Sequence, residues 1–202
     1  MLGKLMKYEI SATSRILVPL YLVLLCMSIA NRFIYRLGIK EGILAFLTGF
    51  MLILQIFLII AILATTAIFM ILRFYKNLLS DEGYLMFTLP VSSHHLILSK
   101  LIITVLWTLI SIIIIIASLC LVFATSSNIS FVFETIKQIF TELVSTFGGN
   151  WTLMLINMIF LILLSLISSI LLIYTSIAVG QLFTRHKIIG SFIAYIILYS
   201  VT

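Results

Sequence analysis

Residues 43–72 read ILAFLTGFMLILQIFLIIAILATTAIFMIL, a run of thirty residues without a charged side chain that ends at Arg73. A helix of about 20 apolar residues is enough to cross the roughly 30 Å of hydrocarbon in a bilayer. At 1.5 Å per residue, these thirty residues make about 45 Å of helix. We therefore interpret the run as a transmembrane helix that tilts in the bilayer or projects into water.

The rest of the chain has the same character. Hydrophobic residues make up 63% of the 202 residues, and charged residues make up only 9%. About a quarter of a soluble domain is charged, so these few charges cannot cover the surface of a water-soluble globule. Cys26 and Cys120 both lie inside apolar runs, which excludes a disulfide scaffold. The composition predicts an all-α integral membrane protein, because helices satisfy their own backbone hydrogen bonds in lipid.

Apolar runs divide the chain into a bundle of about five transmembrane helices, which we treat as a single membrane domain over residues 1–202. The predicted spans are residues 16–35, 43–73, 101–124, 151–183 and 188–202. The last span reaches only about 22 Å at helical rise, and a carboxylate terminus in hydrocarbon is costly. We therefore expect the natural chain to continue beyond Thr202.

The first fifteen residues have an amphipathic pattern. Leu2, Leu5, Met6 and Ile10 can share one helical face, which predicts an N-terminal helix at the membrane interface. A frayed basic start to the chain is the alternative.

Basic residues predict the orientation of the spans. Eight of the twelve Lys and Arg residues fall in the N-terminal segment and in the second and fourth connections. This asymmetry favours a cytoplasmic N-terminus. The net charge of +6 comes in small groups between apolar runs. Nucleic-acid binding is therefore not expected, because it would need a basic stripe with interleaved aromatic residues.

The sequence lacks the motifs of several classes of enzyme. The chain has neither a GxxxxGK[ST] phosphate loop nor an HExxH zinc motif. The predicted spans carry no Asp, Glu, His, Lys or Arg at depth, where an intramembrane enzyme or a proton-driven transporter would need one. His94 and His95 are adjacent and would point about 100° apart on a helix, which makes a poor chelating pair. We expect no catalytic residue, metal or cofactor, and we place any energy source on another polypeptide.

The connection between the second and third spans is the most informative segment. Residues 73–100 read RFYKNLLSDEGYLMFTLPVSSHHLILSK. Ser80 can cap a short helix, which should end near Leu89 because Pro90 disfavours the α conformation before it. Ser92 or Ser93 can then cap a helix that runs through Lys100 into the third span. The short apolar helix needs either a protein partner or the membrane surface to cover it, and the residues alone leave both open.

This segment resembles the cytoplasmic connection between the second and third spans of type-2 ABC exporter permeases, including small permeases of Gram-positive anaerobes. The residues that carry the resemblance are Glu82, Gly83, Leu89, Pro90, Val91, Ser92, Ile97, Leu98 and Lys100. The resemblance implies that the segment is a coupling helix, which docks on a separate ATP-binding subunit. The implied docking residues are Asp81, Glu82, Gly83, Tyr84, Leu85, Met86, Phe87, Leu89 and Pro90.

The resemblance also implies a function. Two permease subunits, as a homodimer or a heterodimer, would pair above two ATPases in the plasma membrane. ATP-driven closure of the ATPases would then export a substrate, and the permease itself would hydrolyse nothing. The family has six spans, whereas this chain has four and a short fifth. The alternative is a membrane scaffold or immunity-type protein that acts only by association.

The segment from Thr125 to Asn150 is expected on the external side. Phe131, Ile136 and Phe140 are spaced helically with charged residues between them, and Gly148 to Asn150 should form a turn. Trp151 follows as an interfacial anchor. Ser176-x-x-x-Gly180 is a small-residue spacing that lets helices approach closely, within the chain or between subunits.

Overall fold

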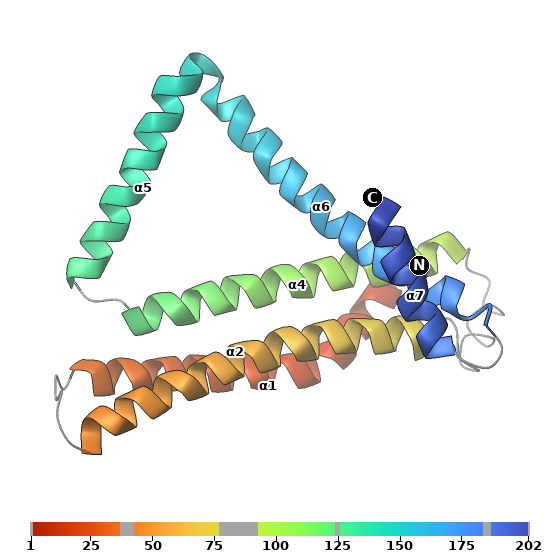
Figure 1. Cartoon of the computed structure of the whole chain (residues 1–202), viewed down its shortest axis with the longest axis horizontal. Helices are drawn as coiled ribbons and strands as arrows, with labels where there is room; N and C mark the ends of the chain where they lie inside the picture. The colour runs from red at the N-terminus through yellow and green to blue at the C-terminus, as the bar shows by residue number, and fades with distance from the viewer. Residues whose placement is uncertain (1, 37–42, 77–92, 124–125, 184–186, 202) are drawn as a thin grey trace. The chain divides into compact units, whose positions relative to one another are not determined.

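The computed structural model describes residues 2–36, 43–76, 93–123, 126–183 and 187–201. Within these ranges the chain is helical and has no strand. The helices are labelled in Figure 1. Their bounds are α1 Leu2–Arg36, α2 Ile43–Phe74, α4 Ser93–Phe123, α5 Ser126–Phe147, the 3-10 turn η2 Gly148–Asn150, α6 Trp151–Gly180 and α7 Lys187–Val201.

Four of these helices are long and apolar enough to cross a membrane. The candidate spans are Met6–Ile34, Phe46–Phe74, His94–Phe123 and Gly148–Gly180, and Lys187–Val201 is a shorter apolar helix. Their surfaces are rich in large apolar side chains, such as Phe57 on α2 and Ile159 on α6, which are 65% and 59% exposed. Soluble proteins rarely expose apolar surface on this scale, because its contact with water is unfavourable. The chain is therefore a helical membrane protein.

The predicted spans end within one residue of the observed helices, except that the fourth ends three residues beyond α6, and two of them begin well after the helices do. Residues 2–15 and the predicted first span form one continuous helix, so the N-terminal segment is not a separate element. Helix α4 begins at Ser93 and runs through Lys100, which confirms the helix expected there. Turn η2 confirms the turn expected between residues 148 and 150.

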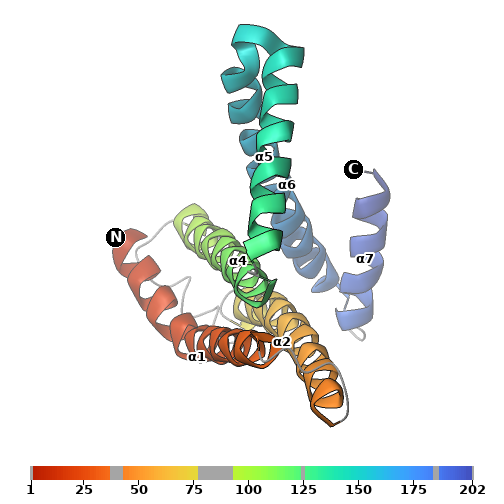
Figure 2. The same cartoon turned by 90° about the vertical axis from the view of Figure 1, so that its left-hand side faces the viewer.

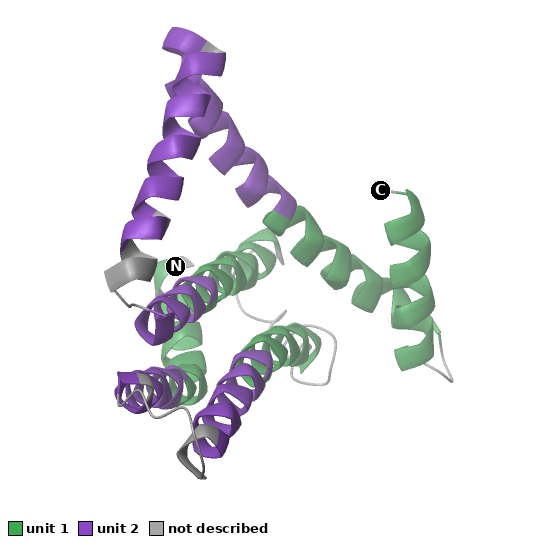
Figure 3. Cartoon of the chain, turned by 60° about the vertical axis from the view of Figure 1, so that its left-hand side comes forward, with its two compact units in different colours: residues 1–20, 61–111, 166–202 green, residues 21–60, 112–165 purple. Residues whose placement is uncertain are grey.

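The chain divides into two compact units (Figure 3). Unit 1 comprises residues 1–20, 61–111 and 166–202, and unit 2 comprises residues 21–60 and 112–165. The apolar core of unit 1 contains Phe74 of α2, Leu96 of α4 and Tyr174 of α6. The rings of Phe74 and Tyr174 stack with their centroids 3.9 Å apart. Aromatic stacking thus joins the end of α2 to α6.

Unit 2 holds α1 against α2 with buried polar side chains. Gln55 Nε2 donates to Ser28 Oγ at 2.8 Å, and Asn31 Nδ2 donates to Gln55 Oε1 at 3.2 Å. Asn31 Nδ2 also donates to the carbonyl oxygen of Met51 at 3.3 Å. Inside a membrane such bonds connect helices that the hydrophobic effect alone does not hold together.

Helix α7 packs closely on the end of α6 in unit 1. A Cβ atom added to Gly180 would lie 2.5 Å from the backbone nitrogen of Ser191 and 2.6 Å from its Cα atom. Ser176 and Gly180 are both buried, so this small-residue spacing serves packing within the chain. Only glycine permits this approach at residue 180.

Candidate functional site

A cluster of charged side chains connects three helices of unit 1. The Glu9 cluster consists of Glu9 and Thr13 on α1, Arg73 at the end of α2 and Lys100 near the start of α4. Lys100 Nζ donates to Glu9 Oε1 at 2.7 Å. Arg73 Nη1 donates to the other carboxylate oxygen of Glu9, to the Glu9 backbone oxygen at 2.9 Å and to Thr13 Oγ1 at 2.8 Å. One carboxylate therefore bridges two cations from two other helices.

Burial makes the Glu9 cluster energetically important. The side chain of Lys100 is 5% exposed, that of Glu9 is 14% exposed and that of Arg73 is 23% exposed. A buried ammonium group without a partner is costly, because the protein interior does not replace its hydration. Glu9 supplies the counter-charge, so α1, α2 and α4 depend on each other at this point. The cluster carries a formal net charge of +1, from two cations and one carboxylate.

A second set of contacts links α4 to α6 next to the Glu9 cluster. Thr104 Oγ1 accepts from or donates to Tyr174 Oη at 2.7 Å, and it lies 2.8 Å from the carbonyl oxygen of Lys100. Tyr174 in turn stacks on Phe74 of α2. Lys100, Thr104 and Tyr174 thus form a continuous path from the charged cluster to α6.

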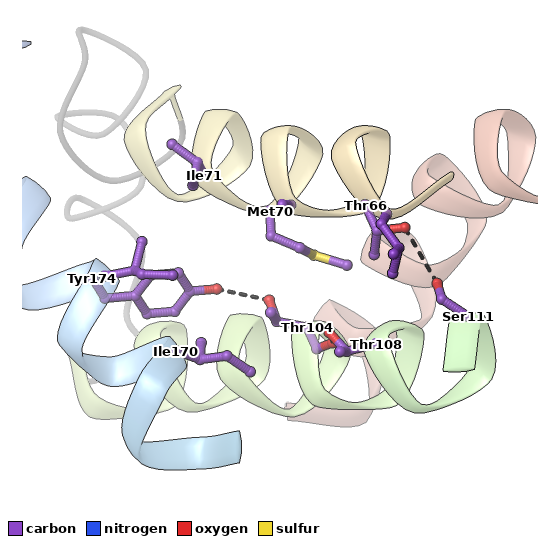
Figure 4. A pocket seen from close by; sticks show the side chains of 11 residues that line it. Thr66, Met70, Ile71, Thr104, Thr108, Ser111, Ile170 and Tyr174 are labelled. Carbon is purple, nitrogen blue, oxygen red and sulfur yellow. Dashed lines mark hydrogen bonds between the residues drawn. The ribbon is translucent and has the colours of Figure 1, made fainter. Parts of the chain in front are cut away.

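Thr104 and Tyr174 border a cavity in unit 1 (Figure 4). The cavity measures about 260 Å³ and lies between α2, α4 and α6. Its walls are mainly apolar, with hydroxyl-bearing side chains contributed by all three helices. The lining residues are Leu63, Thr66, Ala67, Met70, Ile71, Thr104, Thr108, Ser111, Ile170, Ile173 and Tyr174.

The chemistry of the cavity favours apolar contact over polar recognition. Thr66, Thr108 and Ser111 each donate to a carbonyl oxygen of their own helix, at 2.6, 2.8 and 2.8 Å. Thr66 Oγ1 and Ser111 Oγ are also 3.2 Å apart. The hydroxyl groups are therefore largely engaged. Among the described residues no group of three His, Cys, Asp or Glu side chains could hold a metal ion.

The docking residues expected from the sequence lie in the segment between α2 and α4. Residues 77–92 are outside the described part of the chain, and they include every residue from Asp81 to Pro90 that was assigned to the coupling helix. The described structure shows the flanks of this segment, Arg73 on one side and Lys100 on the other, both bound to Glu9.

Sequence reasoning missed the Glu9 cluster. Arg73 was used only as an orientation signal, and Lys100 as an orientation signal and as part of the permease resemblance. Glu9 was left outside the apolar face predicted for the N-terminal helix. The pairs are separated by 64 and 91 residues, so no local pattern reports them. One signal was present. Glu9 is the only acidic residue in the first 33 of the sequence, and it lies on the side of the membrane predicted to hold most of the bases.

Comparisons with known proteins give no relative of this chain. No family model matches the sequence, and neither a curated protein nor a solved structure matches it significantly.

Proposed function

We propose that the chain is the transmembrane permease subunit of a type-2 ABC exporter. In this proposal it lies in the plasma membrane with its N-terminus in the cytoplasm, and it pairs with a second permease subunit. A separate ATP-binding subunit docks on residues 81–90 and hydrolyses the ATP. The four long apolar helices and the resemblance of residues 82–100 to the coupling segment of that family support this proposal.

The observation that carries the proposal is the connection of the two flanks of this segment through Glu9. Arg73 lies in the last turn of α2 before the segment, Lys100 lies in the first turns of α4 after it, and Glu9 on α1 binds both. A force on the segment would therefore reach three helices together. Stiff helices with a shared anchor transmit a displacement that loose loops would absorb.

The path continues toward the cavity. Lys100, Thr104 and Tyr174 connect the Glu9 cluster to α6, and the cavity lies between the helices that would move. In the proposed mechanism, closure of the ATPases pushes the coupling segment, and α2 and α4 shift relative to α6. The cavity then changes shape. Its apolar walls suit amphipathic peptides, lipids or drugs better than ions.

The test is a pull-down of the tagged chain from its native membrane in mild detergent, with the wild type, Glu82→Lys and Glu134→Lys. The two substitutions make the same charge change, but Glu134 is exposed on α5, far along the chain from the docking segment. We expect a nucleotide-binding subunit to co-purify with the wild type and with Glu134→Lys, and to be lost with Glu82→Lys.

Other outcomes count against the proposal. Recovery of the chain alone, or with a partner that binds no nucleotide, would favour a membrane scaffold or immunity-type protein. An ATPase that stays bound after Glu82→Lys would move the docking site away from residues 81–90.

A further inference from the structure

Helix α5 places most of its apolar side chains and all of its charged side chains on two opposite arcs, with Phe131 as an apolar residue on the polar side. At 100° per residue, six apolar residues fall within an arc of about 140°. They are Phe133, Ile136, Ile139, Phe140, Leu143 and Val144. Six polar residues, including all three charged residues of α5, occupy the opposite arc, which is also about 140° wide. They are Glu134, Lys137, Gln138, Thr141, Glu142 and Ser145.

The apolar arc is exposed in the described structure. Phe133 is 74% exposed, Ile136 is 58% exposed and Phe140 is 44% exposed. Such a stripe is unfavourable in water and needs an apolar environment. The three charged residues of the polar arc, Glu134, Lys137 and Glu142, make it unfavourable for α5 to cross the bilayer, since each costs about 2.5–3.5 kcal/mol at the centre of a membrane helix.

The links to α4 and α6 hold α5 near the membrane surface. Two residues separate α5 from the end of α4 at Phe123, and three separate it from the start of α6 at Trp151. A helix of 22 residues is about 33 Å long. A span of 30 residues measures about 45 Å and exceeds the hydrocarbon by about 15 Å. Together with an extended three-residue link, such a span could reach at most about 25 Å beyond the hydrocarbon. An α5 standing perpendicular to the membrane would need its far end to lie about 33 Å beyond the hydrocarbon. Helix α6 could not reach that far, so α5 is confined close to the surface.

Trp151 indicates which way the apolar arc faces. Phe140 packs edge-on against Trp151, with ring centroids 4.8 Å apart and planes at 71°. Tryptophan side chains collect at the boundary between headgroups and hydrocarbon. The contact puts the apolar arc of α5 at the level of this boundary. Gly148, with φ of 55°, provides the left-handed turn that lets α5 and α6 meet, and Figure 2 shows α5 leading through this turn into α6.

We propose that α5 is an in-plane membrane helix, seated in the leaflet at which α4 ends and α6 begins. Phe133, Ile136 and Phe140 lie among the first acyl-chain carbons, and the polar arc faces the headgroups and water. The polar arc carries two carboxylates and one ammonium group, so it gains nothing from anionic lipids. Apolar burial seats the helix, and zwitterionic headgroups are sufficient. This proposal is independent of the transport function.

The test uses nitroxide labels on the full chain in phosphatidylcholine vesicles. Cys26 and Cys120, which are free and exposed, are first replaced by alanine. Single cysteines are then placed at Phe133 and at Phe131. These two phenylalanines are similarly exposed, at 74% and 70%, but they point about 200° apart on the same helix. Phe131 therefore serves as the matched control, and neither substitution disturbs the interior.

We expect the label at Phe133→Cys to be relaxed by oxygen and shielded from a water-soluble nickel chelate, at a depth of about 5–10 Å. The label at Phe131→Cys should show the reverse. Replacing one third of the lipid with anionic phosphatidylglycerol should change neither. Equal access of the chelate to both labels would overturn the proposal. Labels of both variants at the bilayer centre would show that α5 crosses the membrane. Spectral broadening at Phe133→Cys would show that a second copy of the chain covers the arc, if dilution with unlabelled chain removed the broadening. Either result would also overturn it.

Discussion

Glu9→Gln tests whether the Glu9 cluster holds α1, α2 and α4 together. The substitution keeps the size of the side chain and removes the charge that Arg73 and Lys100 share. Breaking a buried ion pair by removing one partner costs about 3–5 kcal/mol, mainly because the remaining charge is left uncompensated. Most of this free-energy loss comes from Lys100, because its unpaired ammonium group would be nearly fully buried. Arg73 contributes less, because it is partly exposed to solvent. We expect a loss of about 3 kcal/mol in the free energy of unfolding.

The second substitution in this test, Lys100→Met, removes the buried ammonium and leaves the pair of Glu9 and Arg73 intact. We expect it to cost about 1 kcal/mol, because the loss of one ion pair is partly offset by the avoided burial of a charge. The double variant should be more stable than Glu9→Gln alone, by about 1–2 kcal/mol. This recovery is specific to a shared counter-charge, since independent sites would add their losses.

The assay is equilibrium unfolding in mixed micelles of mild detergent and dodecyl sulfate, followed by the fluorescence of the two tryptophans. Glu142→Gln, an exposed carboxylate on α5, is the matched control and should stay within about 0.5 kcal/mol of the wild type. The reasoning would be refuted if Glu9→Gln fell within the same range. Additive losses in the double variant would refute it as well.

Two further substitutions test helix packing by the same assay. Gly180→Ala should lower the free energy of unfolding by about 1–3 kcal/mol, because the new methyl group meets the backbone of Ser191. The control, Gly49→Ala, meets nothing within 4 Å and should be neutral or stabilising by up to about 1 kcal/mol. Equal effects would mean that α7 does not pack on α6 as described. Gln55→Leu should cost about 1 kcal/mol, because α1 and α2 lose the hydrogen bonds of Gln55 to Ser28 and from Asn31; an unchanged midpoint would show that these bonds contribute nothing in the membrane.

The sequence predicts the long helices well because their apolar runs are visible without tertiary information. It places the end of the first helix within one residue of Arg36 and the end of the third within one residue of Phe123. Two predicted spans begin later than the helices that contain them, at residues 16 and 101 against Leu2 and Ser93, since hydropathy measures apolarity and not helicity. The helical structure of residues 93–100 itself was predicted correctly from the capping serines. Residues 2–15 are amphipathic and residues 93–100 are mixed, yet both continue the helices that follow them.

The contacts between helices were beyond sequence reasoning for a different reason. Glu9 contacts Lys100 only because α1, α2 and α4 pack together at this point. Hydropathy describes each segment separately and does not show which helices pack together. Tyr174 and Thr104 are likewise 70 residues apart. Residues 81–90, the proposed docking segment, show the opposite case. Their motif is readable in the sequence, and they lie outside the described structure.

The hydroxyl groups on α2 and α4 affect how easily these helices can move. Thr66, Thr108 and Ser111 bond to carbonyl oxygens of their own helices, so a displacement of one helix along the other leaves these bonds intact. Such a displacement would break only van der Waals contacts and a few hydrogen bonds between the helices. The Glu9 cluster, in contrast, fixes one end with bonds that a displacement would break. In the proposed mechanism α2 and α4 would therefore stay joined at the Glu9 cluster and separate most easily farther along, around Thr66 and Ser111.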